Sequence, residues 1–230
     1  MTTNNPHHKS DIAPSSAAAS VHRDDRKQFF NDRAENWTEN CYPEHVQGTG
    51  RETEKKINRL LSLIPFQTGD TVADLGCGTG ILVHPLLERI GKDGHLIEID
   101  YAEEMVRVNQ QNNAGERISF LAEDVMNLSL DTASCNVALA FSCFPHFDDQ
   151  QKALEEINRI LCPGGILAVA HFDSSEELNN FHQSTHPAVM SDKLPDPNTL
   201  ARMAEETGFE ILQGFEEPGF YFVSARSLQS

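Results

Sequence analysis

The sequence lacks the features that mark several classes of protein. None of its apolar runs approaches the roughly 18 residues that a helix needs to cross a bilayer, and the mean hydropathy is −0.43. The first residues show no cationic stretch followed by an apolar segment, as a secretory signal would. The five cysteines are odd in number and include no C-x-x-C pair, which disfavours a disulfide framework. These absences predict a cytoplasmic protein.

Positive charge is scarce as well. Lys and Arg number 18 against 35 Asp and Glu, which gives a formal net charge of −17. A surface of this sign repels a nucleic acid backbone, because binding there depends on Lys and Arg that neutralise phosphates. We therefore expect a neutral or cationic small-molecule substrate, with neither nucleic acid nor a membrane as partner. The sequence carries no signal for an oligomeric state.

The length of 230 residues is suited to one domain with a sizeable core. The first residues are rich in Asn, Ser, Ala and Pro and cannot bury enough apolar surface to become ordered. We expect residues 1–24 to form a disordered N-terminal tail and residues 25–230 to form the folded domain.

The most informative segment is residues 72–82, VADLGCGTGIL. A short apolar run carries Asp74 and leads into three alternating glycines, after which apolar residues recur at helical spacing. The pattern predicts a buried strand, a tight turn and the start of a helix. Glycines let the backbone approach a ligand closely, and a helix N-terminus offers unpaired N–H donors. Nucleotide-like cofactors bind at such turns in open α/β sheets, and a structural turn without a ligand is the alternative.

Strand-like and helix-like segments alternate along the rest of the chain. Helices are expected at 26–37, 52–64, 79–90, 103–112, 149–161 and 198–207, and strands at 71–75, 95–100, 118–121, 136–141, 166–171, 209–214 and 219–225. Strand–helix alternation predicts a parallel sheet with right-handed crossovers. The last two strands are joined by a link too short for a parallel crossover, so they should form an antiparallel hairpin.

Candidate ligand contacts follow the carboxyl ends of these strands. Asp100 closes the second strand, where an acid can accept both hydroxyls of a ribose, and Tyr101 offers a flat face to a purine ring. Asp124 follows the third strand, where a carboxylate can accept from the exocyclic amine of adenine. The stretch 163–165, Pro-Gly-Gly, turns the chain into the fifth strand.

Together these motifs resemble the class I S-adenosylmethionine-dependent methyltransferases of the small-molecule type, over about residues 29–230. The resemblance implies an α/β, Rossmann-like fold: a seven-stranded, mostly parallel sheet with an antiparallel C-terminal hairpin and helices on both faces. It also implies S-adenosylmethionine as cofactor and methyl transfer as the reaction. The cofactor-binding residues it implies are Asp74, Gly76, Cys77, Gly78, Asp100, Tyr101, Asp124, Val125, Phe141 and Ser142.

The family resemblance also suggests what each of these positions does. The backbone of residues 76–78 would contact the methionine part of the cofactor. Asp100 would bind the ribose, Tyr101 would pack on the adenine, and Asp124 would accept from the adenine amine with Val125 alongside. Phe141 and Ser142 would lie near the methyl group.

The residues after the fourth strand bear on the acceptor. Enzymes that methylate amines of nucleic acid bases usually carry an Asn/Asp-Pro-Pro-aromatic motif here, and residues 142–147, SCFPHF, do not. His146 is a candidate general base, because a hydroxyl or ammonium nucleophile must lose a proton and His titrates near neutral pH. The alternative is that His146 caps the next helix. His171 ends the fifth strand at the same rim and is a second catalytic candidate.

The segment 172–197 is longer than a usual crossover and should cover the pocket. A capping box from Ser174 to Glu177 is expected to start a short helix, on which His182 and His186 would share a face. With His146 and His171 they could bind a metal or a substrate that contains one, or they could simply face solvent.

Two further side-chain groups have open interpretations. Cys143 could be a soft ligand for a metalloid substrate or a small packed side chain. The aromatic residues Phe29, Phe30 and Trp37 could form a lid over the cofactor or dock their helix on the sheet edge.

Three functions compete at this level. A methyltransferase acting on a small molecule is favoured, in its general form or with a metal- or metalloid-containing substrate held by His and Cys. A non-catalytic module that binds S-adenosylmethionine is the second possibility. A nicotinamide-dependent dehydrogenase is the third, but its G-x-G-x-x-G turn would place the third glycine one residue later than Gly80.

Overall fold

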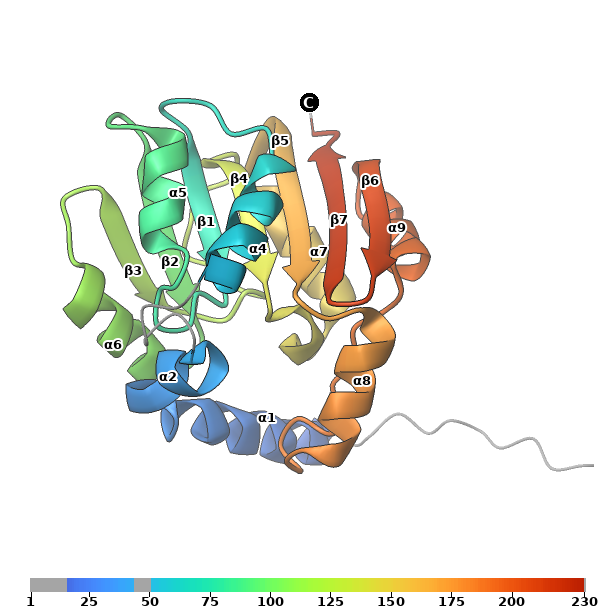
Figure 1. Ribbon diagram of the computed structural model, residues 1–230. Helices are drawn as coiled ribbons and strands as arrows, with labels where there is room; N and C mark the ends of the chain where they lie inside the picture. Colours follow the sequence, from blue (N-terminus) through green and yellow to red (C-terminus); the bar gives the residue numbers. More distant parts are fainter. Residues whose placement is uncertain (1–15, 44–50, 230) are drawn as a thin grey trace, which may run out of the picture.

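A seven-stranded sheet forms the centre of the molecule in the computed structural model, which describes residues 16–43 and 51–229 (Figure 1). The strand order is β3-β2-β1-β4-β5-β7-β6. The strands are β1 (Thr71–Leu75), β2 (His95–Asp100), β3 (Ile118–Ala122), β4 (Cys135–Phe141), β5 (Leu161–His171), β6 (Phe209–Glu217) and β7 (Phe220–Ser227). The first five are parallel, and β7 is antiparallel to both β5 and β6. The predicted fold class is confirmed.

Helices cover both faces of this sheet, because the central strands direct apolar side chains toward both faces. Val137 and Leu139 of β4 pack with α4 (Arg51–Ser62) and α5 (Val83–Ile90). Ala138 and Ala140 face the opposite side, where α7 (Gln150–Ile160) and α9 (Pro197–Glu206) lie. The helix α6 (Glu103–Asn113) follows β2. In the two described ranges no helix is long and apolar enough to cross a membrane.

The N-terminal elements differ from the expectation. The helix α1 spans Ser16–Asn31, so the part of the expected tail from residue 16 onward is helical, while residues 1–15 lie outside the described residues. The three alanines that follow Ser16 have high helix propensity, which the overall composition of the segment does not reveal. The single helix expected at 26–37 is also wrong: the chain turns after Asn31 and continues as η1 (Ala34–Asn36) and α2 (Trp37–Cys41).

The helix α1 runs past the carboxyl ends of the parallel strands, beside α2 and α8 (Ser175–Ser184) (Figure 1). Phe30 and Ala34 pack against Met105 and Val108 of α6. They also share this apolar cluster with Val189, from the segment that follows α8. The first and the last third of the chain therefore meet over the edge of the sheet where ligands bind in open α/β folds.

The capping box predicted for α8 is present: the Ser174 hydroxyl accepts from the Glu177 N–H, and the Glu177 carboxylate accepts from the Ser174 N–H at 2.8 Å. That carboxylate also accepts from the Gly219 N–H at 2.9 Å, which ties the helix to the turn between β6 and β7. The helix ends at Ser184, so the prediction that His182 and His186 share its face is wrong. Helical geometry is disfavoured at His186 because a proline follows it.

We expect Ser174→Ala to lower the free energy of unfolding by about 1 kcal/mol, since the N-cap loses its side-chain acceptor. Ser184→Ala, at the other end of the same helix, should change stability by less than about 0.5 kcal/mol. Urea denaturation of both variants measures the difference. Equal losses in the two would show that the cap contributes nothing specific.

Candidate active site

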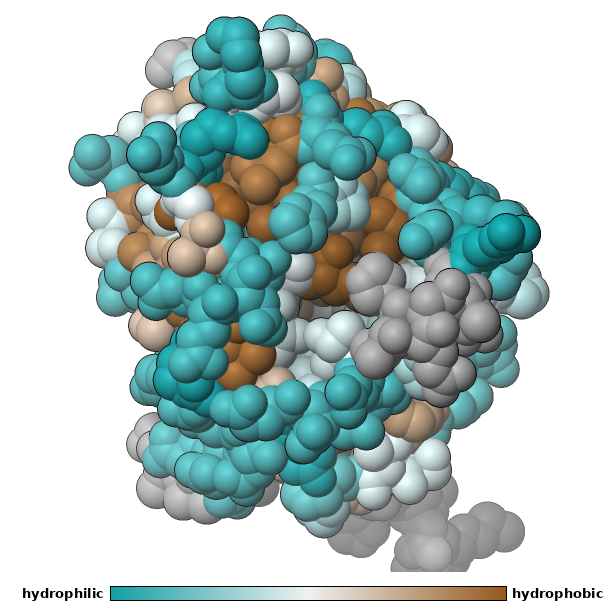
Figure 2. Space-filling model, turned by 60° about the vertical axis from the view of Figure 1, so that its left-hand side comes forward, coloured by the Kyte–Doolittle hydropathy of each residue, from teal (hydrophilic) through white to brown (hydrophobic). Residues whose placement is uncertain are grey.

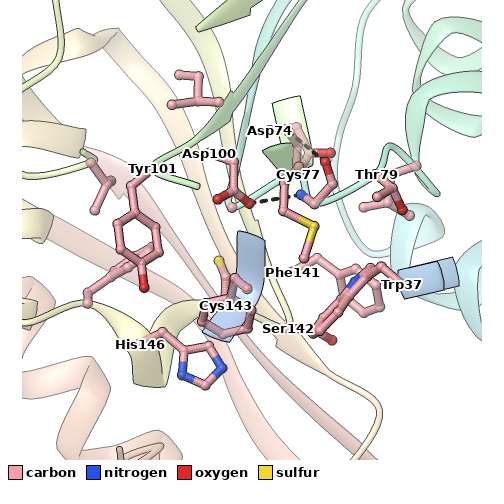
Figure 3. Close-up of a pocket in the computed structure, with 18 of the residues that line it drawn as sticks. Trp37, Asp74, Cys77, Thr79, Asp100, Tyr101, Phe141, Ser142, Cys143 and His146 are labelled. Carbon is pink, nitrogen blue, oxygen red and sulfur yellow. Dashed lines mark hydrogen bonds between the residues drawn. The ribbon is translucent and has the colours of Figure 1, made fainter. Parts of the chain in front are cut away.

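A pocket lies at the carboxyl ends of β1, β2 and β4 (Figure 3). All ten residues predicted to bind the cofactor line it, and so does His146; His171, His182 and His186 do not. The pocket and the solvent space it opens onto together amount to about 970 Å³. Figure 2 shows one face of the molecule, where a hollow with hydrophobic residues exposed inside it is bordered by hydrophilic ones.

The turn after β1 is held against the end of β4 by a close contact. Gly76 has φ +65°, and a Cβ placed there would lie 2.4 Å from the Cβ of Cys143. The Cys143 thiol in turn donates to the carbonyl oxygen of Leu75 at 2.9 Å. Only glycine fits this position without displacing Cys143. Of the two interpretations of Cys143, its surroundings match a packed side chain.

Asp100 binds the same turn from the second strand. Its Oδ2 accepts from the Gly78 N–H at 3.0 Å and its Oδ1 from the Ala102 N–H at 2.9 Å. Each carboxylate oxygen has a further lone pair, so Asp100 can accept from a ligand without giving up either bond. Burial raises the pKa of Asp100 to about 6.

Two more buried acids lie behind the turn. Burial and the neighbouring carboxyls Glu98 and Asp100 raise the pKa of Asp74 well above its usual value. Burial likewise raises the pKa of Glu98 to about 7, opposed by a 2.6 Å hydrogen bond from the Asn109 amide. Three carboxyl groups so close together favour a ligand that is cationic or rich in hydrogen-bond donors.

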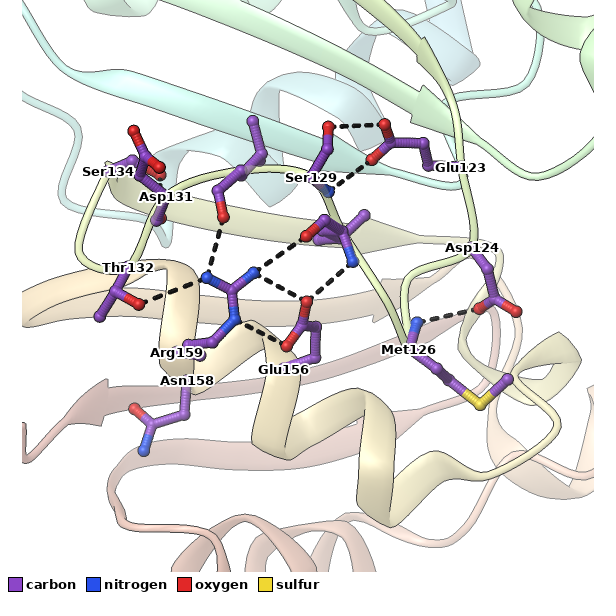
Figure 4. A network of polar contacts seen from close by, with 12 residues as sticks. Glu123, Asp124, Met126, Ser129, Asp131, Thr132, Ser134, Glu156, Asn158 and Arg159 are labelled. Atoms are coloured by element: carbon purple, nitrogen blue, oxygen red, sulfur yellow. Dashed lines mark hydrogen bonds and ion pairs between the residues drawn. The ribbon is translucent and has the colours of Figure 1, made fainter.

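The loop after β3 supplies Asp124 and Val125 to the other end of the pocket. One Asp124 oxygen accepts from the Met126 N–H at 2.9 Å, and the other pairs with Arg23 of α1. The carboxylate of Glu123, which also lines the pocket, accepts from the backbone N–H and the hydroxyl of Ser129 (Figure 4).

A polar network holds this loop on α7. Arg159 donates to the carbonyl oxygens of Leu128 and Leu130 at 3.1 and 2.8 Å, and Glu156 accepts from the Leu128 N–H at 2.8 Å (Figure 4). Arg159 and Glu156 also pair with each other at 2.8 Å. The backbone that presents Asp124 and Val125 is therefore fixed by contacts outside the pocket.

Aromatic residues from the N-terminal helices close one side of the pocket. Phe30 lies edge-on to Trp37, Tyr101 and His146, with ring centroids 5.6, 6.3 and 5.1 Å away. The hydroxyl of Thr38 in α2 bonds to that of Thr79 in the glycine turn at 2.7 Å. Phe30 and Trp37 thus line the pocket as a lid would, and Phe29 packs instead against His186, outside it.

Of the four histidines singled out in the sequence, His146 is the one that lines the pocket. It ends η2 (Phe144–His146), and its Nδ1 lies 2.7 Å from Oδ2 of Asp192. The carboxylate only accepts, so Nδ1 carries the proton and the lone pair of the neutral ring is on Nε2. Burial lowers the pKa of His146, although Asp192 opposes this. The helix-cap alternative is wrong, since Asp149 caps α7 by accepting from the Lys152 N–H.

The other three histidines lie elsewhere. His171 is buried against Tyr221, and its Nε2 has no hydrogen-bond partner among the described residues. Burial, with His146 and His182 nearby, lowers the pKa of His171 to about 3. His182 is buried, with its ring 5.1 Å from that of His146, whereas His186 is exposed. In residues 16–43 and 51–229 no three His, Cys, Asp or Glu side chains are grouped as metal ligands.

Sequence reasoning missed Asp192 and Arg26, which meet His146 in the folded chain. Arg26 donates to Asp192 at 2.8 Å and also pairs with Asp148. No local signal could reveal these partners, because they are 46 and 120 or more positions away from the groups they contact. Tyr42, which also lines the pocket, lies in a segment without a recognisable motif.

Comparison with known proteins agrees with this geometry. A family model described as "Methyltransferase domain" matches residues 73–169. The chain is 26% identical over 181 residues to the O-methyltransferase rstn1 of Aspergillus nomiae, covering 74% of this chain and 78% of that protein. It is 27% identical over 214 residues to a demethylmenaquinone methyltransferase of Staphylococcus aureus, covering 80% and 88%. An arsenite methyltransferase of Halobacterium salinarum is 27% identical over 63% of this chain, which spans only 38% of that relative.

Solved structures share the fold. A chain in the complex of the Haloferax volcanii Trm112 methyltransferase activator with a methyltransferase superposes with a TM-score of 0.71 at 20% identity, covering 87% of this chain and 98% of that one. An S-adenosylmethionine-dependent methyltransferase from Aquifex aeolicus gives 0.62 at 20% identity, with 74% and 88% covered.

Fold, glycine turn and relatives define a methyltransferase built on a Rossmann-like sheet. These findings support a class I S-adenosylmethionine-dependent methyltransferase, and the dehydrogenase alternative is set aside.

We expect Gly76→Ala to destabilise the protein by about 2 kcal/mol or more, because the new methyl combines a strained positive φ with the Cys143 clash. Gly164→Ala is the matched control: its φ of +77° is similar, but no atom lies within 4 Å of an added Cβ. The control should therefore lose only about 1 kcal/mol. Thermal unfolding without ligand measures both, and equal losses would show that the contact with Cys143 is not the constraint.

Proposed function

We propose that this enzyme transfers the methyl group of S-adenosylmethionine to a proton-bearing nucleophile on a small molecule, with His146 as general base. The single observation that supports it best is that His146, held by Asp192 through Nδ1, lines the same pocket as the ten cofactor candidates. The acceptor class is supported by the acidic charge of the chain and by relatives named as O-methyltransferases and demethylmenaquinone methyltransferases.

The residues present fit the cofactor. Asp100 can accept from ribose hydroxyls beyond its two backbone bonds, and the ring of Tyr101 offers a face for adenine. Asp124, with Val125 alongside, would accept from the adenine amine. The backbone of Gly76–Gly78 and the carboxyl of Asp74 would lie at the methionine end, where a cationic ligand relieves the repulsion between buried acids.

Bound S-adenosylmethionine supplies an electrophilic methyl group on a cationic sulfonium. The part of the protein in the reaction is then to align the acceptor and to take its proton. Phe141 and Ser142 end β4 in the pocket, and Ser142 holds a left-handed φ of 56°, a strained geometry of the kind that clusters at functional sites. Nε2 of neutral His146 would receive the proton of the nucleophile as the in-line displacement proceeds.

The other hypotheses have less support. His171 does not line the pocket, so we assign it no contact with the acceptor. A metalloid acceptor held by cysteine would need a thiolate, and burial raises the pKa of both Cys77 and Cys143 well above the usual value. A non-catalytic binding module would have no need of a carboxylate-anchored imidazole at the mouth of the cofactor site.

We expect binding of S-adenosylmethionine to weaken as the pH falls below about 6, the pKa of Asp100. The ionised carboxylate is the better acceptor for ribose hydroxyls, and protonation removes that advantage. Asp100→Asn should weaken binding by about 1–3 kcal/mol at pH 7.5. Asp93→Asn, an exposed position, should leave affinity unchanged. Calorimetry that shows binding of NAD and no response to S-adenosylmethionine or S-adenosylhomocysteine would contradict the assignment.

We expect His146→Ala to reduce kcat by roughly 10²–10⁴-fold, the usual contribution of a positioned base. The dissociation constant of S-adenosylmethionine should stay within about twofold of the wild type, since the backbone and carboxylates that hold it are untouched. His84→Ala, at an exposed position of α5, is the control. Radiolabelled methyl transfer into an extract of small metabolites gives the readout. Full activity in His146→Ala would remove the base from the mechanism.

A further inference from the structure

Three segments that are far apart in the sequence meet at the far side of His146. Asp192, in the loop between α8 and α9, contacts Nδ1 of His146 through Oδ2 at 2.7 Å. Its Oδ1 accepts from Nη1 of Arg26 at 2.8 Å. Arg26 and Asp192 are only 2% and 6% exposed, so one buried carboxylate connects helix α1 to the imidazole.

We infer that Asp192 and Arg26 are positioning residues for His146, so that the base is complete only when α1 is packed over the pocket. The inference deepens the proposed function and rests on it. Neither residue lies in the motifs that identify the family, and neither needs to touch the acceptor to act.

The physical reason starts with the carboxylate. Asp192 can only accept, so it fixes the tautomer in which Nε2 carries the lone pair, and it stabilises the imidazolium that forms when His146 takes a proton. An isolated buried carboxylate would be costly. Arg26 offsets that cost by donating to Oδ1 of Asp192, and Oδ2 of Asp192 accepts from His146.

Arg26 is well suited to hold this position. Its second terminal nitrogen pairs with Asp148, which follows η2 and also lies 3.4 Å from Arg23 of the same helix. The contacts of α1 with this region are therefore made largely by buried or half-buried charge pairs. Removing Arg26 would leave Asp192 and Asp148 without their shared cation.

The groups that face His146 set the direction of each expected change. Asp192 raises its pKa, while burial, His182 of α8 and Arg26 of α1 lower it. His171 of β5 is neutral at working pH, because its own pKa is near 3. Loss of the Asp192 charge should therefore lower the pKa of His146, and loss of the Arg26 charge should raise it. Opposite shifts are not expected from a general loss of structure.

The test is an ¹⁵N NMR titration of the histidine rings in the full chain, with the wild type, Asp192→Asn, Arg26→Gln and Lys27→Gln. Lys27→Gln is the matched control, because this substitution removes an ion pair between α1 and Glu103 that does not involve Asp192. We expect the pKa of His146 to fall in Asp192→Asn, to rise in Arg26→Gln and to stay in place in Lys27→Gln. An unchanged pKa in Asp192→Asn, or shifts of the same sign in both variants, would overturn the inference.

A kinetic arm separates positioning from structure. The acidic limb of kcat/KM should follow His146, moving to lower pH in Asp192→Asn and to higher pH in Arg26→Gln, with kcat reduced roughly 10- to 100-fold in each. In the His146→Ala background, Asp192→Asn should change kcat by less than about twofold, because both substitutions act on one proton transfer. If Asp192→Asn reduced kcat by a further 10- to 100-fold in the His146→Ala background, Asp192 would act on something other than His146.

Two further measurements keep the outcomes distinct. Arg26→Lys should restore most of the kcat lost in Arg26→Gln, and its failure to do so while Lys27→Gln stays fully active would contradict a role for the Arg26 charge. The NMR titrations need no methyl transfer. If they show the expected opposite shifts while His146→Ala retains full kcat, the contacts stand and the base of the proposed function falls, together with the catalytic meaning of the contacts.

Discussion

The contact between Gly76 and Cys143 is the constraint on which the rest of the site depends. It brings the turn after β1 within van der Waals distance of Cys143, the second residue after β4, and a thiol hydrogen bond to Leu75 fixes the pair. Strands β1 and β4 are neighbours in the sheet, with Leu75 beside Ala140. The contact between Gly76 and Cys143 therefore determines where both strands end and their loops begin. Asp100, bonded to Gly78 from the next strand, is placed by the same turn. The backbone geometry of these turns thus defines the pocket, and the aromatic side chains of the N-terminal helices only complete one side of it.

Electrostatics then divides the site into two parts. At the sheet, Asp74, Glu98 and Asp100 are buried together and have raised pKa values, an arrangement that favours a cationic or donor-rich ligand. At helix α1, the acids at 124, 148 and 192 are paired instead with Arg23 and Arg26. In a chain with a net charge of −17, these two cations sit where acids from three different loops come together. The N-terminal helix is therefore held to the domain by charge as well as by Phe30.

Much of the fold could be predicted because its signals are local. The apolar run at 71–75, the acid at Asp100 and the short link before Phe220 are read from a few neighbouring residues, and the bounds of β1 and β2 agree with the structure. The capping box at Ser174 is an equally local signal, and it is present in the structure. Errors arose where local patterns compete with context. The composition of residues 16–24 predicts a disordered tail, whereas the alanines in this segment favour the helix that continues to the buried Arg26 and Phe30.

The sequence by itself determined the strand–helix alternation of a parallel sheet, the glycine turn and the acids that follow the strands, since these depend on spacings within one supersecondary unit. Only the tertiary structure decided the surroundings of the histidines. His146, His171, His182 and His186 look alike in the sequence, yet one lines the pocket, two are buried and one is exposed. The partner that distinguishes His146 is Asp192, brought to it by a loop 46 residues away and held by Arg26 from the opposite end of the chain. Such contacts arise from the packing of whole elements. A buried carboxylate is stabilised by the charged groups that pack against it, and these groups stand at no fixed spacing from it in the sequence.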